Sequence, residues 1–169
     1  FKNYLKKNIK QSLILIETLF YCFLKYLVID HITIMRYLII GGAGIFAIHT
    51  IKEILSHKDT TGVLSIGRNP QRSNAFTLGV GEGDDRYTYR QMHLKFEIDF
   101  LTDLIEEYKP NFIVNFAALA YATSWYKSSR YYDTNVSAVS QLCEFLYDKK
   151  YLKQFLQIGS SEIYGPYDF

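Results

Sequence analysis

The stretch MRYLIIGGAGIFAI, residues 35–48, joins a short apolar run, a glycine-rich loop and the start of an amphipathic helix. This order is that of a phosphate-binding turn. Gly41 permits a tight turn, Gly44 lets a ligand approach the backbone, and the small Ala47 lets the helix pack on the strand. The stretch therefore predicts a strand–turn–helix unit that can accept a dinucleotide.

The first turn of this predicted helix contains Ile45, Phe46 and Ala47. Its free backbone N–H groups and the positive end of the helix dipole would face a pyrophosphate. Glycine spacing alone also fits a tight turn in an α/β protein of another kind. The strand before the loop and the amphipathic helix after it favour dinucleotide binding.

Apolar strands alternate with helical periodicity along the chain from Met35, which is the pattern of a parallel sheet covered by helices. Strands are expected at residues 36–40, 63–66, 87–94, 112–116 and 155–159, with a long connection at residues 69–86. The buried helix faces are expected to consist of Ala47, Ile48, Ile51, Ile54 and Leu55, then Ile98, Leu101, Leu104, Ile105 and Tyr108, then Val136, Val139, Leu142, Cys143 and Leu146. The predicted fold class is α/β, a doubly wound parallel sheet.

The end of the second predicted strand indicates the type of cofactor. A carboxylate at this position would accept a hydrogen bond from an NAD ribose, but the chain has Gly67, Arg68 and Asn69, with Arg72 nearby. A guanidinium suits a 2′-phosphate through charge-assisted bonds. We therefore favour NADP over the alternative, NAD. Arg68 could also be an ordinary solvated charge at the end of a strand.

Five motifs follow in order: GGAGIFA (residues 41–47), NFAA (115–118), SW (124–125), TNVSAV (134–139) and SSEIYG (160–165). Together they resemble the extended short-chain dehydrogenase/reductases, specifically the nucleotide-sugar dehydratases and epimerases, from Met35 to the end of the chain. The resemblance implies a Rossmann fold, a nucleotide-sugar substrate and transient oxidation of the sugar at C4 with NAD(P). It also implies a homodimer formed through the helix after Thr134. Phe145 lies off the main apolar stripe of this helix, so we expect it to face the partner.

The resemblance also assigns roles to the NFAA segment and its surroundings. It places Phe116, Ala117 and Ala118 along the cofactor, although the same residues could simply be the buried end of a strand. Asn135 resembles the family's helix asparagine, which supports the catalytic centre, and a helix N-cap is an equal alternative.

Two adjacent residues occupy the region that contacts adenine in the family. The family usually has an aspartate after the third strand, and the spacing places His93 there, followed by Leu94. A neutral imidazole can accept one hydrogen bond.

The SSEIYG motif carries the catalytic residues that the resemblance implies. Ser160 would hydrogen-bond the substrate, Ser161 would assist proton transfer at C6, and Glu162 would abstract the C5 proton. A partly desolvated carboxylate at the end of a strand can act as such a base. The alternative, which we favour less, is that Glu162 is a helix-start or surface carboxylate.

The family's catalytic Tyr-x-x-x-Lys should follow SSEIYG, but the only such spacing in the sequence is Tyr21–Lys25, at the wrong position. We therefore expect residues 35–169 to be an NAD(P)-binding domain truncated at its C-terminus, without its substrate domain. A non-catalytic NAD(P)-binding sensor or scaffold protein is the alternative.

Composition limits the remaining possibilities. The chain has 169 residues, of which 49% are hydrophobic and 21% charged, and a net charge of +2, which argues against nucleic acid as a partner. Two cysteines without metal-ligand spacing indicate a reducing cytoplasm and no metal site. Charged residues interrupt the apolar segment at residues 12–29, which argues against a membrane span. Residues 1–34 are expected to be a non-native or loosely attached extension.

Overall fold

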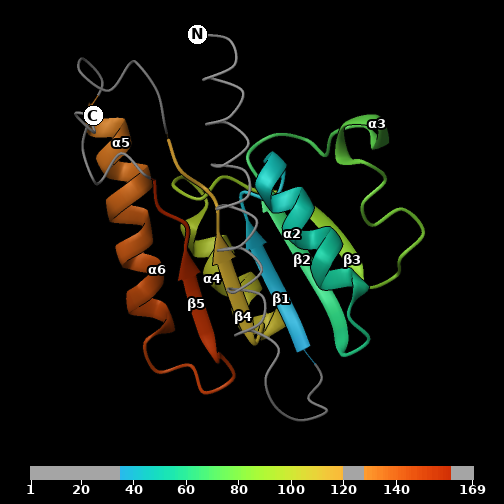
Figure 1. Cartoon of the computed structure of the whole chain (residues 1–169). Helices are drawn as coiled ribbons and strands as arrows, with labels where there is room; N and C mark the ends of the chain where they lie inside the picture. Colours follow the sequence, from blue (N-terminus) through green and yellow to red (C-terminus); the bar gives the residue numbers. More distant parts are fainter. Residues whose placement is uncertain (1–34, 120–127, 161–169) are drawn as a thin grey trace, which may run out of the picture. The chain divides into compact units, whose positions relative to one another are not determined.

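A computed structural model describes residues 35–119 and 128–160 of the chain. Its centre is a five-stranded parallel sheet with the strand order β3-β2-β1-β4-β5 (Figure 1). The strands are β1 (Met35–Ile40), β2 (Thr60–Gly67), β3 (Tyr87–Gln91), β4 (Phe112–Asn115) and β5 (Gln154–Gln157). The helices are α2 (Ile45–Ser56), α3 (Asn74–Thr77), α4 (Ile98–Tyr108), α5 (Ser128–Tyr131), the π-helical turn η1 (Tyr132–Ser137) and α6 (Ala138–Leu146). The predicted doubly wound α/β architecture is confirmed.

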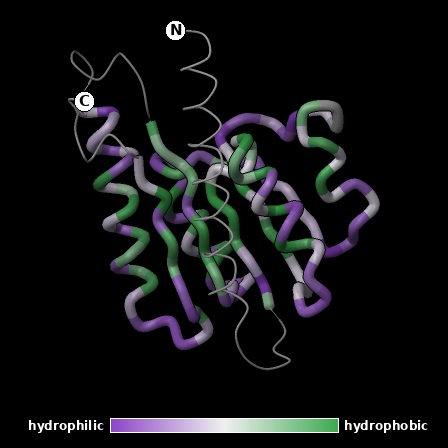
Figure 2. The backbone as a smooth tube through the Cα atoms, viewed as in Figure 1, coloured by the Kyte–Doolittle hydropathy of each residue, from purple (hydrophilic) through white to green (hydrophobic). Residues whose placement is uncertain are grey.

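The alternation of side chains along the strands divides the core between the two faces of the sheet. One face packs against α4 and α6 through a cluster that includes Leu38, Ile66, Ile113, Leu101 and Leu142. The other face is covered by α2, which lies in front of the sheet in Figure 1 while α4 lies behind it. Figure 2 shows hydrophobic residues concentrated along the central strands, as expected for strands buried on both faces.

Two predicted strands end two or three residues too late, whereas the other three predicted ends agree with the structure to within one residue. The third stops at Gln91 rather than residue 94. The N–H of Met92 still donates to Gly67 O at 2.9 Å, and the chain turns after this residue. The fifth covers Gln154–Gln157 rather than residues 155–159. The expected long connection contains one short helix, α3, and the positive-φ glycines Gly79, Gly81 and Gly83.

The predicted apolar face of the last helix is partly wrong. The buried residues are spaced by four, namely Thr134, Ala138, Leu142 and Leu146, whereas Val136 and Cys143 are exposed. Val136 lies in η1, whose π-helical turn takes more residues per turn than the regular helix that the periodicity assumed, whereas Cys143 lies beyond it in α6. Phe145, expected to face a partner, is half-buried and packs partly against the core, and Lys149 Nζ lies 4.3 Å from its ring centre.

The chain adds β2 and β3 on one side of β1 and then β4 and β5 on the other side, so the strand order switches at β1. In open parallel sheets, ligands bind at this switch point, outside the carboxyl ends of the strands. No helix among residues 35–119 and 128–160 is long and apolar enough to cross a membrane. The apolar segment at residues 12–29 lies outside the described residues.

Candidate functional site

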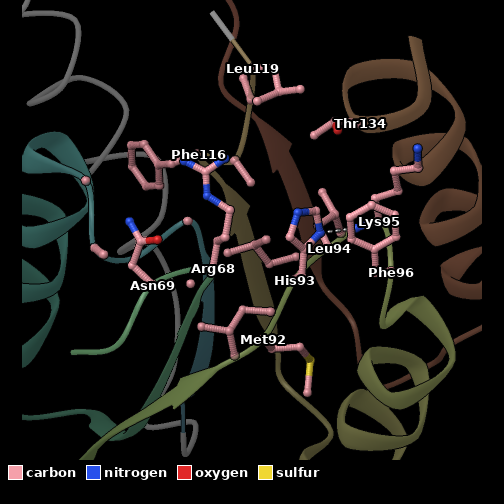
Figure 3. A pocket seen from close by; sticks show the side chains of 18 of the residues that line it. Arg68, Asn69, Met92, His93, Leu94, Lys95, Phe96, Phe116, Leu119 and Thr134 are labelled. Carbon is pink, nitrogen blue, oxygen red and sulfur yellow. Dashed lines mark hydrogen bonds between the residues drawn. The ribbon is translucent and has the colours of Figure 1, made fainter. Parts of the chain in front are cut away.

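A pocket of about 300 Å³ opens at the carboxyl ends of β1, β2, β3 and β4 (Figure 3). Nine of the predicted cofactor-binding residues line it: Gly41, Gly44, Arg68, Asn69, His93, Leu94, Phe116, Ala117 and Ala118. These residues come from four separate loops, which meet because the carboxyl ends of parallel strands lie at one edge of the sheet. The structure therefore brings together most of the site that the sequence predicted.

The glycine loop is fixed by backbone geometry. Gly41 has φ +80°, and both Gly41 N–H and Gly42 N–H donate to Ile66 O at 2.9 Å. A Cβ at Gly41 would lie only 2.7 Å from Ala117 N, so no larger residue fits. A Cβ at Gly44 would meet one atom, Gly41 O at 3.4 Å, so space remains beside that backbone. This is the kind of cradle that a pyrophosphate needs.

Helix α2 begins at this loop without a capping side chain. Its N-cap is Gly44, which has no side chain that could accept a hydrogen bond from the first turn, and this turn contains no acidic residue. The first helical bond runs from Ile48 N–H to Gly44 O at 3.0 Å, so the N–H groups of residues 45–47 have no intrahelical acceptor.

The side chains of those three residues do not line the pocket. Ile45 and Phe46 are 60% and 61% exposed, and Ala47 is buried against the sheet. Any contact of residues 45–47 with a ligand would therefore be made by their backbone.

Side chains of β3 hold the loop that carries Arg68. Tyr89 Oη donates to Asn69 O at 2.6 Å, and Gln91 Nε2 donates to Arg68 O at 3.1 Å. No described residue accepts a hydrogen bond from the Arg68 guanidinium, which reaches into the pocket in Figure 3. Arg72 stacks on Phe76, with its Cζ 3.9 Å from the ring centre. Two guanidinium groups thus lie beside the pocket on a fixed loop.

His93 lies two residues beyond the end of β3 and caps the turn that leads into α4. Lys95 N–H donates to His93 Nδ1 at 3.2 Å, and His93 N–H donates to Glu97 Oε2 at 2.6 Å. The pKa of His93 is lowered below its usual value, mainly because the ring is desolvated and secondly because the positive charge of Arg68 is near. The ring is therefore neutral near pH 7, and its acceptor nitrogen is already occupied. We expected His93 to accept a hydrogen bond from adenine, and in the structure its Nδ1 accepts from Lys95 N–H.

The loop after β4 is held from both sides. The buried Asn115 accepts from Ala117 N–H at 3.0 Å and donates to Gln157 Oε1 at 2.8 Å. Asn135, in η1, donates to Leu119 O at 2.9 Å and accepts from Leu119 N–H at 2.8 Å. Asn135 is therefore not a helix N-cap, and its amide fixes the backbone that lines one wall of the pocket.

Several lining residues were not predicted: Ala43, Met92, Lys95, Phe96, Leu119 and Arg130. Arg130 reaches the pocket from α5. Lys95, in the turn before α4, forms an ion pair with Asp133, which joins that turn to η1. Ala43 lies within the GGAGIFA motif, but no local sequence signal marks Lys95 or Arg130, because their position depends on how two distant loops fold together.

Only one of the three predicted catalytic residues lies in the described part of the chain. Ser160 follows β5 and is exposed, whereas Ser161 and Glu162 lie outside the described residues. No group of acidic, histidine or cysteine residues in the described part of the chain could hold a metal ion.

The fold and the site define a Rossmann-type domain with an open glycine turn at the switch point of the sheet. A family model, the NAD dependent epimerase/dehydratase family, matches residues 37–169, and the chain belongs to this family. Comparison with curated protein sequences gives no significant match.

Solved structures share the fold. A dTDP-glucose 4,6-dehydratase from Bacillus anthracis, in complex with NAD, is 22% identical with a TM-score of 0.62, over 79% of this chain and 40% of that one. A UDP-glucose-4-epimerase from Stenotrophomonas maltophila, with bound NAD and formylated UDP-arabinopyranose, is 21% identical with a TM-score of 0.65, over 80% of this chain and 40% of that one. A dTDP-glucose 4,6-dehydratase from Streptomyces venezuelae is 22% identical with a TM-score of 0.66, over 80% of this chain and 42% of that one. The chain thus spans about two fifths of the length of these structures.

Proposed function

We propose that the pocket binds a nicotinamide dinucleotide and that the whole protein is a nucleotide-sugar dehydratase or epimerase that transiently oxidises the sugar at C4. One observation carries the proposal: an open glycine turn, an uncapped helix N-terminus and Arg68 line a single pocket at the switch point of the sheet. The neighbours described above were crystallised with NAD or nucleotide-sugar ligands, which agrees with the proposal.

Each wall of the pocket has a proposed role. The free N–H groups of residues 45–47 would hold the pyrophosphate, and Gly41 and Gly44 would leave room for it. Phe116, Ala117 and Ala118 would pass along the ribose and nicotinamide, on backbone that Asn115 and Asn135 keep in place. The nicotinamide, when bound, would supply the hydride acceptor for the sugar.

The cofactor preference is proposed to be NADP, with NAD as the alternative. Among the described residues that line the pocket, none carries a carboxylate that could accept from an NAD ribose hydroxyl. Arg68 stands where the second strand ends and has no competing acceptor among the described residues. A bidentate guanidinium–phosphate contact fits this position.

The catalytic roles stay with the SSEIYG motif. Ser160 would hydrogen-bond the sugar, Ser161 would assist proton transfer at C6, and Glu162 would take the C5 proton in a dehydratase. These roles concern the whole protein, since the chain spans about 40% of the dehydratase it matches.

A test of this function uses the whole protein with UDP- and dTDP-hexoses in deuterated water. The expected result is cofactor-dependent conversion to a 4-epimer, detected by proton NMR, or to a 4-keto-6-deoxy sugar, detected by mass spectrometry. Deuterium at C5 would indicate that a base such as Glu162 removes that proton, as in a dehydratase, and its absence would indicate an epimerase. Cofactor binding without conversion of any of these sugars would contradict the enzyme and favour the sensor or scaffold.

We also propose that the protein is a cytoplasmic homodimer. Because Phe145 is partly buried, the candidate contact surface moves to exposed apolar residues around the start of α4 and η1, namely Phe96, Phe100, Tyr132 and Val136. Their exposed fractions run from 55% to 73%, which is unusual for side chains of this type on neighbouring elements.

A further inference from the structure

The pocket has a one-sided charge. Four of its lining side chains are cationic, namely Arg68, Arg72, Lys95 and Arg130, and no lining residue in the described part of the chain is acidic. Lys95 is neutralised by Asp133, and Arg72 stacks on Phe76. On the β2 side of the pocket the lining cations are Arg68 and Arg72. Of these two, Arg68 has neither an acidic nor an aromatic partner among the described residues. A ligand that meets these groups must present an anion.

His93 faces the same space from the end of β3. Its Nδ1 is occupied by Lys95 N–H, so a neutral ring carries its proton on Nε2. The remaining polar atom of the ring is thus a hydrogen-bond donor. Figure 3 shows the His93 ring and the Arg68 guanidinium both reaching into the pocket from neighbouring strand ends.

Other charged groups around His93 agree with a neutral donor. Arg68 and Lys95 disfavour an imidazolium, whereas Glu97 favours one but is engaged with the His93 backbone N–H. Phe96 lies against the ring, with centroids 4.5 Å apart. The ring is held in place by the cap on one side and by an aromatic side chain on the other.

We propose that His93 is a specificity-determining residue that donates its Nε2–H to the 2′-phosphate of NADP, beside Arg68. This inference rests on the proposed use of NADP. It replaces a contact to adenine, which NAD and NADP share, with a contact to the one group that distinguishes them. The cap on Nδ1 is what commits the ring to donation.

Two substitutions test the role without removing the cap. Asp and Asn at position 93 can both accept from Lys95 N–H, as N-cap residues do. They have the same shape, but Asn can still donate while Asp adds a negative charge. We expect His93→Asp to weaken NADP by at least about tenfold, as loss of a charge-assisted bond does. His93→Asn should weaken NADP by no more than about threefold, a fraction of that loss. Neither should weaken NAD by more than about twofold, since NAD lacks the phosphate.

Nitrogen-15 NMR of the histidine side chains in the ligand-free protein gives an independent readout. The expected tautomer of His93 is protonated at Nε2, and a proton on Nδ1 would overturn the proposal. Equal weakening of NADP and NAD by His93→Asp would also overturn it, because the residue would then contact a shared part of the cofactor. An unmodified protein that does not prefer NADP would instead refute the proposed cofactor preference. If NADP is preferred through Arg68 and His93→Asp leaves the preference unchanged, only the role of His93 fails.

Discussion

Replacing Gly41 with alanine is expected to lower the free energy of unfolding by at least about 3 kcal/mol and to abolish measurable cofactor binding, because two penalties combine. Gly41 has φ +80°, which an L-residue adopts at a cost, and the added Cβ would lie 2.7 Å from Ala117 N. The neighbouring backbone cannot move away easily. Ala117 N–H is held by Asn115 Oδ1 at 3.0 Å, and Phe116 N–H by Ile40 O at 2.8 Å.

Gly83→Ala is the matched control for this substitution. Gly83 also has positive φ, +70°, but its Cβ would have no neighbour within 4 Å. It should therefore carry only the backbone penalty, about 1–2 kcal/mol, and leave cofactor binding intact. Chemical denaturation and cofactor titration of both variants measure the difference. Equal stability and equal binding of the two variants would show that the close approach of Gly41 to the β4 loop is not important.

Replacing Arg68 with glutamate is expected to reverse the cofactor preference. Loss of a charge-assisted contact costs about 1.5–3 kcal/mol, or roughly 10- to 150-fold in affinity. Like-charge repulsion between the carboxylate and a 2′-phosphate adds several kcal/mol. NADP binding should therefore fall by more than about 100-fold, while NAD should bind as well or better, because a carboxylate there can accept from the ribose hydroxyls.

Arg90→Glu controls for the change in net charge. Arg90 is exposed on β3 and lines a second cavity, together with Arg36 and Tyr108, rather than the proposed cofactor pocket. It should leave the ratio of NADP to NAD affinity unchanged in isothermal titration. A loss of both cofactors in Arg68→Glu, to the same extent, would remove the basis for the NADP assignment.

The sequence predicted those parts of the site that depend on neighbouring residues in the chain. Gly41, Gly44 and the start of α2 are contiguous, so their local geometry follows from residue type. Arg68, His93 and Ala117 could be grouped in advance because residues that follow parallel strands share one edge of the sheet. The structure placed all three around the same pocket.

Features that depend on long-range geometry could not be predicted. Lys95 reaches the pocket because the turn before α4 folds toward it, and Arg130 because α5 does. Periodicity assumed a regular helix after Thr134, and the π-helical turn η1 changed which residues are buried. The hydrogen-bonding state of His93 depends on a backbone N–H two residues away, which residue type alone does not reveal.

Hydrogen–deuterium exchange with and without NADP tests the central claim most directly. The N–H groups of residues 45–47 lack an intrahelical acceptor and should exchange quickly in the free protein. If they hold the pyrophosphate, saturating NADP should protect them, together with residues 116–119, while residues 86–90 beside the second cavity should not change. Unchanged exchange at residues 45–47 under saturating NADP would contradict the account.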